Sequence, residues 1–369
     1  MKQYWLLNPG PVNTTATVKQ AALAADLCHR EPEYSALMTE VRHKLLEATG
    51  IGTKGYQTAL IAGSGTAALE LSIASIVRPQ RKLLVLNNGV YGARLLKMAQ
   101  AHGIDCRDIT SPWHQPPSVD AVEHVLREDA SVDAVALVHH ETTTGLLNPV
   151  EAIGRLARRY DKVFFLDSVS GLGGETLDID GWGVDLVAAT ANKCLHGLPG
   201  VAFVLASDRG RAHVAEVPPR SVYFDLRNYL EQQEAGAVPF TPCISGTYTL
   251  LQALDELEAE GGISQRIATY RERSSLIRRE FQALGLSLYL DEALLSNSIT
   301  TFKLPKGLSY VSLHERLKQE GFVIYAGQGK LEHEVFRIAN MGHVPMEIYV
   351  KLVDALRHVL RDIQSVATI

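Results

Sequence analysis

Two charged residues stand where apolar segments end, 26 residues apart along the chain. Asp167 closes the run VFFLD, and Lys193 follows the next apolar run in the turn-rich segment ANKCLHGLPG. A carboxylate at such a place can pair with a protonated ring nitrogen, and a lysine desolvated in a cleft can form a Schiff base. For either residue alone, a turn-capping aspartate or a solvated surface lysine remains the simpler interpretation.

A third candidate is the segment AGSGTAALE, residues 62–70, which follows an apolar run and opens a helical pattern. Its glycines, Gly65 among them, let the backbone approach an anion, and Ser64 and Thr66 add hydroxyl donors at the positive end of a helix. The segment has neither the GK[ST] of a Walker loop nor the GxGxxG of a dinucleotide site. It predicts a site for a single phosphate, and a plain strand-to-helix turn stays open as the alternative.

The three signals support one another. A phosphate cradle, a carboxylate for a pyridinium nitrogen and an amine for an imine are the three groups that pyridoxal 5′-phosphate requires. They occur in that order at the ends of apolar runs, and ligands of open α/β sheets bind beyond the carboxyl ends of the strands. We therefore expect Asp167 to keep the ring nitrogen protonated and Lys193 to hold the aldehyde and transfer protons.

The elements that must position these groups are short apolar runs separated by helical patterns, which predict a mostly parallel sheet covered by helices on both faces. After about residue 208 the pattern changes, and two helices over 245–262 and 263–285 precede a smaller α+β region. We predict an N-terminal arm over 1–15, a large domain over 16–258 and a small domain over 259–369. The runs predicted as strands of the large domain are 57–63, 82–88, 132–140, 162–169, 184–191 and 200–207.

The composition argues against a nucleic-acid-binding protein, a thiolate metal protein and a membrane-spanning protein. The 369 residues are 46% hydrophobic and carry a formal net charge of −5, which gives no general attraction to nucleic acid. The four cysteines form no CxxC pair, so we expect no thiolate metal site and a reducing, cytoplasmic setting. No apolar run of about 18 residues is present, so no membrane span is expected.

The chain resembles the class V, fold-type I pyridoxal-phosphate enzymes, and among them it is most similar to the 2-aminoethylphosphonate–pyruvate aminotransferases. The similarity covers nearly the whole chain. The stretches that carry it are LLNPGPV (6–12), GSGTAALE (63–70), NNGVYGAR (87–94), HHETTTGLLNP (139–149), DSVSGLGG (167–174), ANKCLHGLPG (191–200), GFVIYAGQ (321–328) and FRIANMG (336–342).

The resemblance implies roles for individual residues. Lys193 and Asp167 are the catalytic pair, and Arg337 binds the substrate carboxylate, for which the guanidinium fork is suited. The remaining cofactor contacts implied are Ser64, Gly65 and Thr66 on the phosphate, Thr190 adding a hydroxyl, Tyr91 on the ring face, Thr142 at the 3-hydroxyl, Asn192 beside the lysine, and Thr241 completing the phosphate site of the partner subunit. The implied assembly is a homodimer with active sites at the interface, and no metal is expected.

Two departures from the family bear on the substrate. Asn8, in LLNPGPV, stands where the family often has threonine, and we expect Asn8 and Gly10 to lie at the substrate. The stretch CHREPEY, residues 28–34, is similar to the His-Arg pair of phosphoserine aminotransferases, so His29 and Arg30 are candidates for binding a phosphonate in the partner's site. A helix-start arginine paired with a neighbouring glutamate is an equally good interpretation.

The reaction implied is transamination of 2-aminoethylphosphonate with pyruvate, which gives phosphonoacetaldehyde and L-alanine. An ammonia-lyase acting on the 1-hydroxy form of the substrate needs the same lysine and the same electron sink, so it remains an alternative. Alanine–glyoxylate or serine–pyruvate transamination is another alternative. A regulatory module that only binds the cofactor is disfavoured because no basic helix-turn-helix pattern is present.

Overall fold

A seven-stranded sheet forms the centre of the molecule in the computed structural model, which describes residues 4–53 and 55–366. The strand order is β2-β10-β9-β8-β5-β3-β4, and all neighbours run parallel except β10, which is antiparallel to β2 and β9. The mostly parallel sheet is therefore confirmed. Its strands are β2 (Tyr56–Gly63), β3 (Lys82–Asn87), β4 (Asp105–Thr110), β5 (Val132–Val138), β8 (Val163–Asp167), β9 (Leu186–Thr190) and β10 (Gly200–Ser207).

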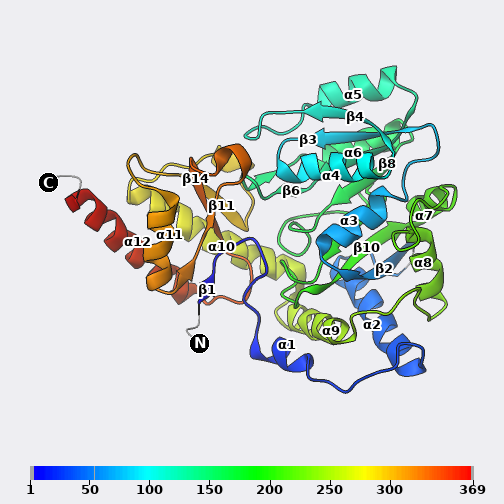
Figure 1. Cartoon of the computed structure of the whole chain (residues 1–369), viewed down its shortest axis with the longest axis horizontal. Coiled ribbons are helices and arrows are strands. Elements are labelled where there is room, and N and C mark those ends of the chain that lie inside the picture. The colour runs from blue at the N-terminus through cyan, green and yellow to red at the C-terminus, as the bar shows by residue number, and fades with distance from the viewer. Residues whose placement is uncertain (1–3, 54, 367–369) are drawn as a thin grey trace.

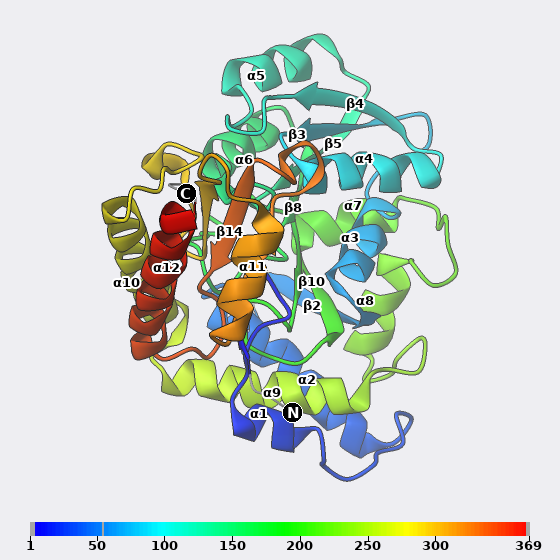
Figure 2. The ribbon, with the colours of Figure 1, turned by 60° about the vertical axis from the view of Figure 1, so that its left-hand side comes forward.

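Helices cover both faces of this sheet (Figures 1 and 2). Consecutive side chains of a strand enter opposite cores: Phe164 packs among residues of α2, α5, α6 and α9, whereas Phe165 packs among those of α3, α4 and α8. Strands buried on both faces need apolar residues at every position, which explains the unbroken apolar runs. The helices are α1 (Ala16–Ala21), α2 (Pro32–Ala48), α3 (Gly65–Ile73), α4 (Val90–Ala101), α5 (Val119–Glu128), α6 (Val150–Arg159), α7 (Asp208–Ala215), α8 (Leu226–Glu234) and α9 (Ile244–Ala259).

A separate core lies at the C-terminal side, where α10 leads away from the large sheet (Figure 1). The sheet of this part has the order β11-β14-β13, with both pairs antiparallel, and α10, α11 and α12 contribute to its core. Its elements are α10 (Gly262–Ala283), β11 (Ile299–Lys303), α11 (Tyr310–Gln319), β12 (Phe322–Val323), β13 (Tyr325–Ala326), β14 (Val335–Ala339) and α12 (Met346–Val366). This matches the predicted α+β arrangement.

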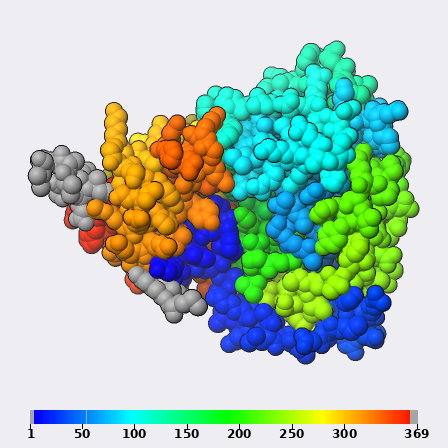
Figure 3. Space-filling view, viewed as in Figure 1, coloured from blue at the N-terminus to red at the C-terminus, as the bar shows by residue number. Residues whose placement is uncertain are grey.

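The N-terminal segment joins this smaller part to the rest. Its strand β1 (Trp5–Leu6) pairs in parallel with β12, and the chain then continues to α1, which contacts α9. In the space-filling view, the blue segment lies between the orange surface of the C-terminal part and the green surface of the large sheet's domain (Figure 3). The chain therefore crosses from one part to the other close to its start.

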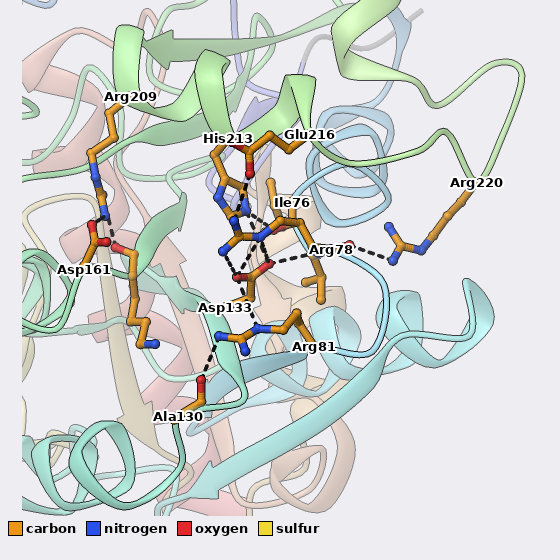
Figure 4. Close-up of polar contacts among 12 residues, drawn as sticks. Ile76, Arg78, Arg81, Ala130, Asp133, Asp161, Arg209, His213, Glu216 and Arg220 are labelled. Carbon is orange, nitrogen blue, oxygen red and sulfur yellow. Dashed lines mark hydrogen bonds and ion pairs between the residues drawn. The ribbon is translucent and has the colours of Figure 1, made fainter.

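The amino ends of the strands carry an ion-pair network (Figure 4). Asp133, at the start of β5, accepts hydrogen bonds from Arg78 N at 2.9 Å and Arg78 Nη2 at 2.5 Å, and His213 of α7 lies 3.5 Å away. Burial would raise the pKa of Asp133, but the Arg78 contacts hold it below its usual value. The network fixes α7 to the edge of the sheet opposite to the carboxyl ends.

A buried glutamate links the two parts of the molecule at the carboxyl side. Glu175, from the loop after β8, accepts hydrogen bonds from Asn297 N at 2.8 Å, Asn297 Nδ2 at 2.7 Å and Ser298 Oγ at 3.1 Å. Its burial raises the pKa to about 8, in spite of these donors. The folded protein therefore keeps Glu175 protonated at pH values where the unfolded chain has lost that proton.

This difference predicts a pH effect on stability. A folded pKa raised above the unfolded one gives stability that is complete at low pH and declines as the pH rises toward about 8. The thermal midpoint of the wild type, measured relative to that of Glu175→Gln, should therefore fall between pH 5 and pH 8 and level off above. A difference that stays constant over this range would contradict the protonation state inferred for Glu175.

Candidate active site at the carboxyl edge of the sheet

Asp167 is the last residue of β8 and is almost completely buried. Its Oδ1 accepts a hydrogen bond from Val169 N at 3.0 Å, the one hydrogen bond of this carboxyl group among the described residues. Burial raises its pKa to about 7, Glu141 adds to the rise, and Arg94 and Lys193 counteract it. A buried carboxyl group with an uncommitted oxygen fits a cationic partner such as a protonated ring nitrogen.

Lys193 lies in the turn that follows β9, the neighbouring strand. Its Nζ donates to the backbone oxygen of Pro9, from the N-terminal segment. Burial lowers the pKa of this amine, and the nearby Arg337 guanidinium lowers it further. Desolvation of this kind favours the neutral, nucleophilic amine that imine formation requires.

The backbone of Gly10 lies against the side chain of Lys193. Its φ of +96° lies in the left-handed region, and a Cβ atom built there would stand 2.6 Å from Lys193 Cδ and 2.9 Å from Cε. Any side chain at this position therefore displaces the stem of Lys193. The predicted contact of Gly10 with the substrate stays a prediction.

The variant Gly10→Ala is expected to lose most of the cofactor that the sequence predicts on Lys193, because the added methyl group displaces the lysine. Gly50→Ala is the matched control, since Gly50 also has a positive φ, of +76°, but no atom within 4 Å of the added Cβ. The measurement is the visible absorbance of bound cofactor per chain after gel filtration. Equal cofactor content in the two variants would refute this role of Gly10.

The predicted phosphate segment is the start of α3. Ser64 is the N-cap residue, yet its exposed hydroxyl makes no capping hydrogen bond. Gly65 packs so closely that an added Cβ would stand 2.7 Å from Val169 Cγ1. The Thr66 hydroxyl, half-buried, also has no hydrogen-bond partner among the described residues. Uncommitted hydroxyls at the positive end of a helix fit an anion such as a phosphate group.

The two other residues predicted to contact the phosphate, Thr190 and Thr241, lie outside the start of α3. The Thr190 hydroxyl lies 2.9 Å from Asn192 Oδ1 and 3.2 Å from the backbone oxygen of Val201, so it already has partners in its own chain. Thr241 is exposed just before α9. Its role in a partner's phosphate site stays a prediction.

Thr142 follows the short strand β6 (His140–Glu141), and its Oγ1 is buried without a hydrogen-bond partner in the described part of the chain. A buried hydroxyl without a partner is unfavourable, so this one is suited to hydrogen-bond a ligand. The 3-hydroxyl of the pyridine ring would supply one. His140 Nε2 is buried without a partner in the same way and was not identified from the sequence.

Arg337, on β14, is buried but has no carboxylate partner among the described residues. Its Nε donates to Ala326 O at 2.8 Å, and its Nη1 donates to Thr142 O at 2.6 Å and to Gln328 Oε1 at 3.1 Å. A buried guanidinium is costly without a counter-ion. This one is therefore suited to receive an anionic group of a ligand, and the Thr142 contact ties it to the large domain.

Glu141 organises the site and was missed by the sequence analysis. Its fully buried carboxyl group accepts from Tyr91 N and Gly92 N, each at 3.2 Å, at the start of α4, and from Thr143 Oγ1 at 2.5 Å. Gly89 makes this approach possible, because a Cβ there would fall 2.2 Å from the Glu141 side chain. The carboxyl group thus fixes the backbone of Tyr91, the residue predicted to cover the ring face.

The remaining predicted substrate residues belong to two N-terminal segments, and the segment of Asn8 also brings Pro9 and Gly10 to the Lys193 side chain. Asn8 is buried, and its Nδ2 donates to Pro11 O at 3.0 Å, which shapes the N-terminal segment. His29 and Arg30 lie in the loop between α1 and α2, away from β14 (Figures 1 and 2). Arg30 is exposed, and among the described residues no ion pair joins it to Glu31 or Glu33. Their phosphonate-binding role stays a prediction.

Residues 4–53 and 55–366 contain no group of three or more histidine, cysteine, aspartate or glutamate side chains able to hold a metal ion. No helix in this part of the chain has the length and apolarity that crossing a membrane requires.

Comparison with known proteins identifies the family. The model of the family "Aminotransferase class-V" matches residues 17–347. A 2-aminoethylphosphonate–pyruvate transaminase of Vibrio cholerae serotype O1 is 37% identical over 362 residues, 97% of this chain and 98% of that protein. One of Klebsiella pneumoniae is 38% identical over 352 residues, 93% of this chain and 94% of that protein.

A solved structure shows the same fold. The alanine–glyoxylate aminotransferase of Nostoc sp. superposes with a TM-score of 0.91 at 29% identity, over 98% of this chain and 96% of that one. The predicted fold-type I architecture is thereby confirmed. Together with the family match over most of the sequence, it leads to one conclusion: this chain is a member of the class V aminotransferase family.

Proposed function

We propose that this enzyme transfers the amino group of 2-aminoethylphosphonate to pyruvate, giving phosphonoacetaldehyde and L-alanine. The observation that carries the proposal is the buried Arg337 guanidinium, which lacks a carboxylate partner among the described residues and lies near the Lys193 amine. It favours substrates that combine an amine or keto group with an acidic group. The phosphonate is suggested by relatives that carry this activity in their names and align over nearly the whole chain.

The proposed cofactor is pyridoxal 5′-phosphate, whose protonated ring would supply an electron sink for the substrate carbon. Asp167 would hold the ring nitrogen, and Thr142 Oγ1 the ring oxygen. Tyr91, fixed by Glu141, would cover one face of the ring. Ser64, Gly65 and Thr66, at the start of α3, would bind the phosphate, and Asn192 would lie beside the lysine.

The chain's own groups account for the proton transfer. The desolvated Lys193 Nζ is suited to take a proton from the carbon that carries the substrate's amino group and to release it to the carbon on the other side of that nitrogen. The hydrogen bond from Lys193 Nζ to Pro9 O holds the free amine in one orientation. Burial of Asp167 and Thr142 excludes water from the groups that would contact the cofactor.

One guanidinium can serve both half-reactions. Phosphonate and carboxylate oxygens can both accept from Nη2 of Arg337, the guanidinium nitrogen that has no hydrogen bond among the described residues. Nη1 is held by Thr142 O and Gln328 Oε1, so the guanidinium keeps one orientation for either anion. The doubly charged phosphonate gains from a second cation, for which Arg30 and His29 of a partner subunit are the candidates.

The proposal includes a homodimer in which Thr241, His29 and Arg30 of one subunit complete the site of the other. The loop that carries His29 and Arg30 lies away from β14, the strand of Arg337, which supports a role for these two residues in the partner's site (Figures 1 and 2). We also propose the division into an arm over 1–15, a large domain over 16–258 and a small domain over 259–369. It is supported by the separate cores of the two sheets.

Substitutions of Arg337 and Arg30 are expected to affect different half-reactions. Arg337→Ala should weaken both half-reactions, because removing one member of a buried charged pair typically costs about 2–5 kcal/mol. Arg30→Ala should weaken mainly the half-reaction with 2-aminoethylphosphonate. Single-turnover rates with 2-aminoethylphosphonate and with L-alanine, measured separately, check both. If Arg30→Ala affects both donors equally or neither, Arg30 does not bind the phosphonate.

The proposed function is tested by a donor comparison. The purified holoenzyme would be incubated with pyruvate and, in separate reactions, 2-aminoethylphosphonate, its 1-hydroxy form, serine or phosphoserine, while alanine formation is followed. The proposal predicts the highest kcat/KM with 2-aminoethylphosphonate. A higher value with serine would reassign the substrate, and ammonia release from the 1-hydroxy form without pyruvate would identify a lyase.

A further inference from the structure

A buried three-way contact joins the turn of Lys193 to the small domain. His196 Nε2 lies 2.5 Å from Tyr270 Oη, and Gly342 N donates to Nε2 at 3.0 Å and to Oη at 3.2 Å. Tyr270 belongs to α10 and Gly342 to the loop after β14, so three segments far apart in sequence meet here. We call these three residues the His196 hub.

The direction of the hydrogen bonds follows from the chemistry of the atoms. A backbone N–H can only donate, and the single Gly342 hydrogen is shared between His196 Nε2 and Tyr270 Oη. With Nε2 unprotonated, Tyr270 Oη–H donates to it across the 2.5 Å contact. Burial, together with Arg266 and Arg273, lowers the pKa of His196 well below its usual value. The imidazole is therefore neutral, and Tyr270 Oη and Gly342 N, both from the small-domain side, meet at its Nε2.

The first arm of the hub is the turn that carries Lys193. His196 has a φ of +65°, which is uncommon for a residue other than glycine and unfavourable unless surrounding contacts impose it. Its backbone N–H donates to Lys193 O at 3.0 Å. The imidazole contacts therefore hold a strained turn whose first residue is the reacting lysine.

The second arm is the end of the strand that carries Arg337. Gly342 follows Arg337 by five residues, and Arg273 Nη1 donates to both Asn340 O at 3.1 Å and Gly342 O at 3.0 Å. Gly342 has a φ of +88°, and a Cβ there would stand 2.8 Å from Val12 Cβ and from Asn13 O. The loop after β14 is thus clamped between α10, the N-terminal arm and His196.

We propose that the His196 hub positions the two ends of the substrate site, setting the separation between the Lys193 amine and the Arg337 guanidinium. The inference rests on the proposed function, because it takes Lys193 as the reacting amine and Arg337 as the receptor for the acidic group. His196 and Tyr270 act through these two residues and touch no substrate atom. A shift of about 1 Å in such a separation can slow a reaction by about 100-fold.

Tyr270→Phe is the principal variant, because it removes a hydroxyl from the hub and keeps the ring. Tyr349→Phe is its matched control. Both tyrosines are fully buried, and Arg273 lies over both rings, 5.7 Å from that of Tyr270 and 5.6 Å from that of Tyr349. The Tyr349 hydroxyl takes no part in the hub. His196→Asn is a second variant, since asparagine tolerates a left-handed backbone.

The probes are aminooxyacetate and methoxyamine, which share a reactive aminooxy group but of which only the first carries a carboxylate. Their second-order rates with the holoenzyme are followed by loss of the visible absorbance of the cofactor. We expect the rate advantage of aminooxyacetate over methoxyamine to fall about tenfold in Tyr270→Phe and His196→Asn and to stay unchanged in Tyr349→Phe. A general loss of structure would slow both probes alike and leave their ratio unchanged.

Amide hydrogen exchange of residues 336–345, measured without substrate, adds a readout that does not depend on activity. Faster exchange in Tyr270→Phe than in Tyr349→Phe is the expected result. If the ratio of the aminooxyacetate rate to the methoxyamine rate is unchanged in both Tyr270→Phe and His196→Asn, the positioning role of the hub is wrong and the proposed function still stands. A wild-type enzyme with no preference for aminooxyacetate would overturn the role of Arg337, and with it the proposed function.

Discussion

Alanine in place of Lys193 should abolish transamination, lowering kcat by several powers of ten while the protein stays folded. The amine is the proposed imine partner and also the group that transfers the proton, so both contributions disappear together. No other described residue can substitute, because the turn, Pro9 O and Gly10 position this one side chain.

The measurement is alanine formation from 2-aminoethylphosphonate and pyruvate, with the thermal midpoint and circular dichroism of the variant as the control for folding. Turnover close to that of the wild type would remove Lys193 from the mechanism.

Asparagine in place of Asp167 should retain part of the cofactor and lose most activity. The carboxyl group is buried, with a pKa raised to about 7 and a single hydrogen bond from Val169 N, so a cationic ring nitrogen would restore its ionised form. An amide cannot stabilise that cation. Removing one member of a buried charged pair costs about 2–5 kcal/mol, which corresponds to about a 30- to 5,000-fold fall in kcat.

Asp133→Asn is the matched control, because Asp133 is an equally buried carboxylate at the opposite edge of the same sheet. It should lower the thermal midpoint through the lost Arg78 contacts and leave kcat nearly unchanged. The comparison requires the kcat and cofactor content of both variants. Kinetics of Asp167→Asn that match the wild type would assign the ring nitrogen to another residue.

The sequence predicted the large sheet well, because strands buried on both faces leave unbroken apolar runs such as VFFLD. It also predicted that Asp167 and Lys193 stand at one edge, since β8 and β9 are neighbours and parallel. Strand β4 was not predicted, because it lies at the edge of the sheet and is not buried on both faces. The residues of its sequence, DCRDIT, are mostly exposed and form no apolar run.

Contacts between segments far apart in sequence could not be predicted in this way. The hydrogen bond from Arg337 to Thr142 O joins residues 195 positions apart, and the backbone oxygen that accepts it carries no sequence signal. Glu141 stands within the ETTTG segment, and its role depends on the close approach of Gly89 and α4, which are distant from it in sequence. The glycine at position 89 was the available clue to that close approach.

The most direct test of the proposed function is a stoichiometric half-reaction. The holoenzyme, free of pyruvate, would be mixed with excess 2-aminoethylphosphonate, and phosphonoacetaldehyde, ammonia and alanine would be quantified before and after pyruvate is added. A transaminase that uses Lys193 forms one phosphonoacetaldehyde per active site, releases no ammonia, and makes alanine only once pyruvate is present. Continuous release of ammonia without pyruvate, or no phosphonoacetaldehyde at all, would contradict the proposed function.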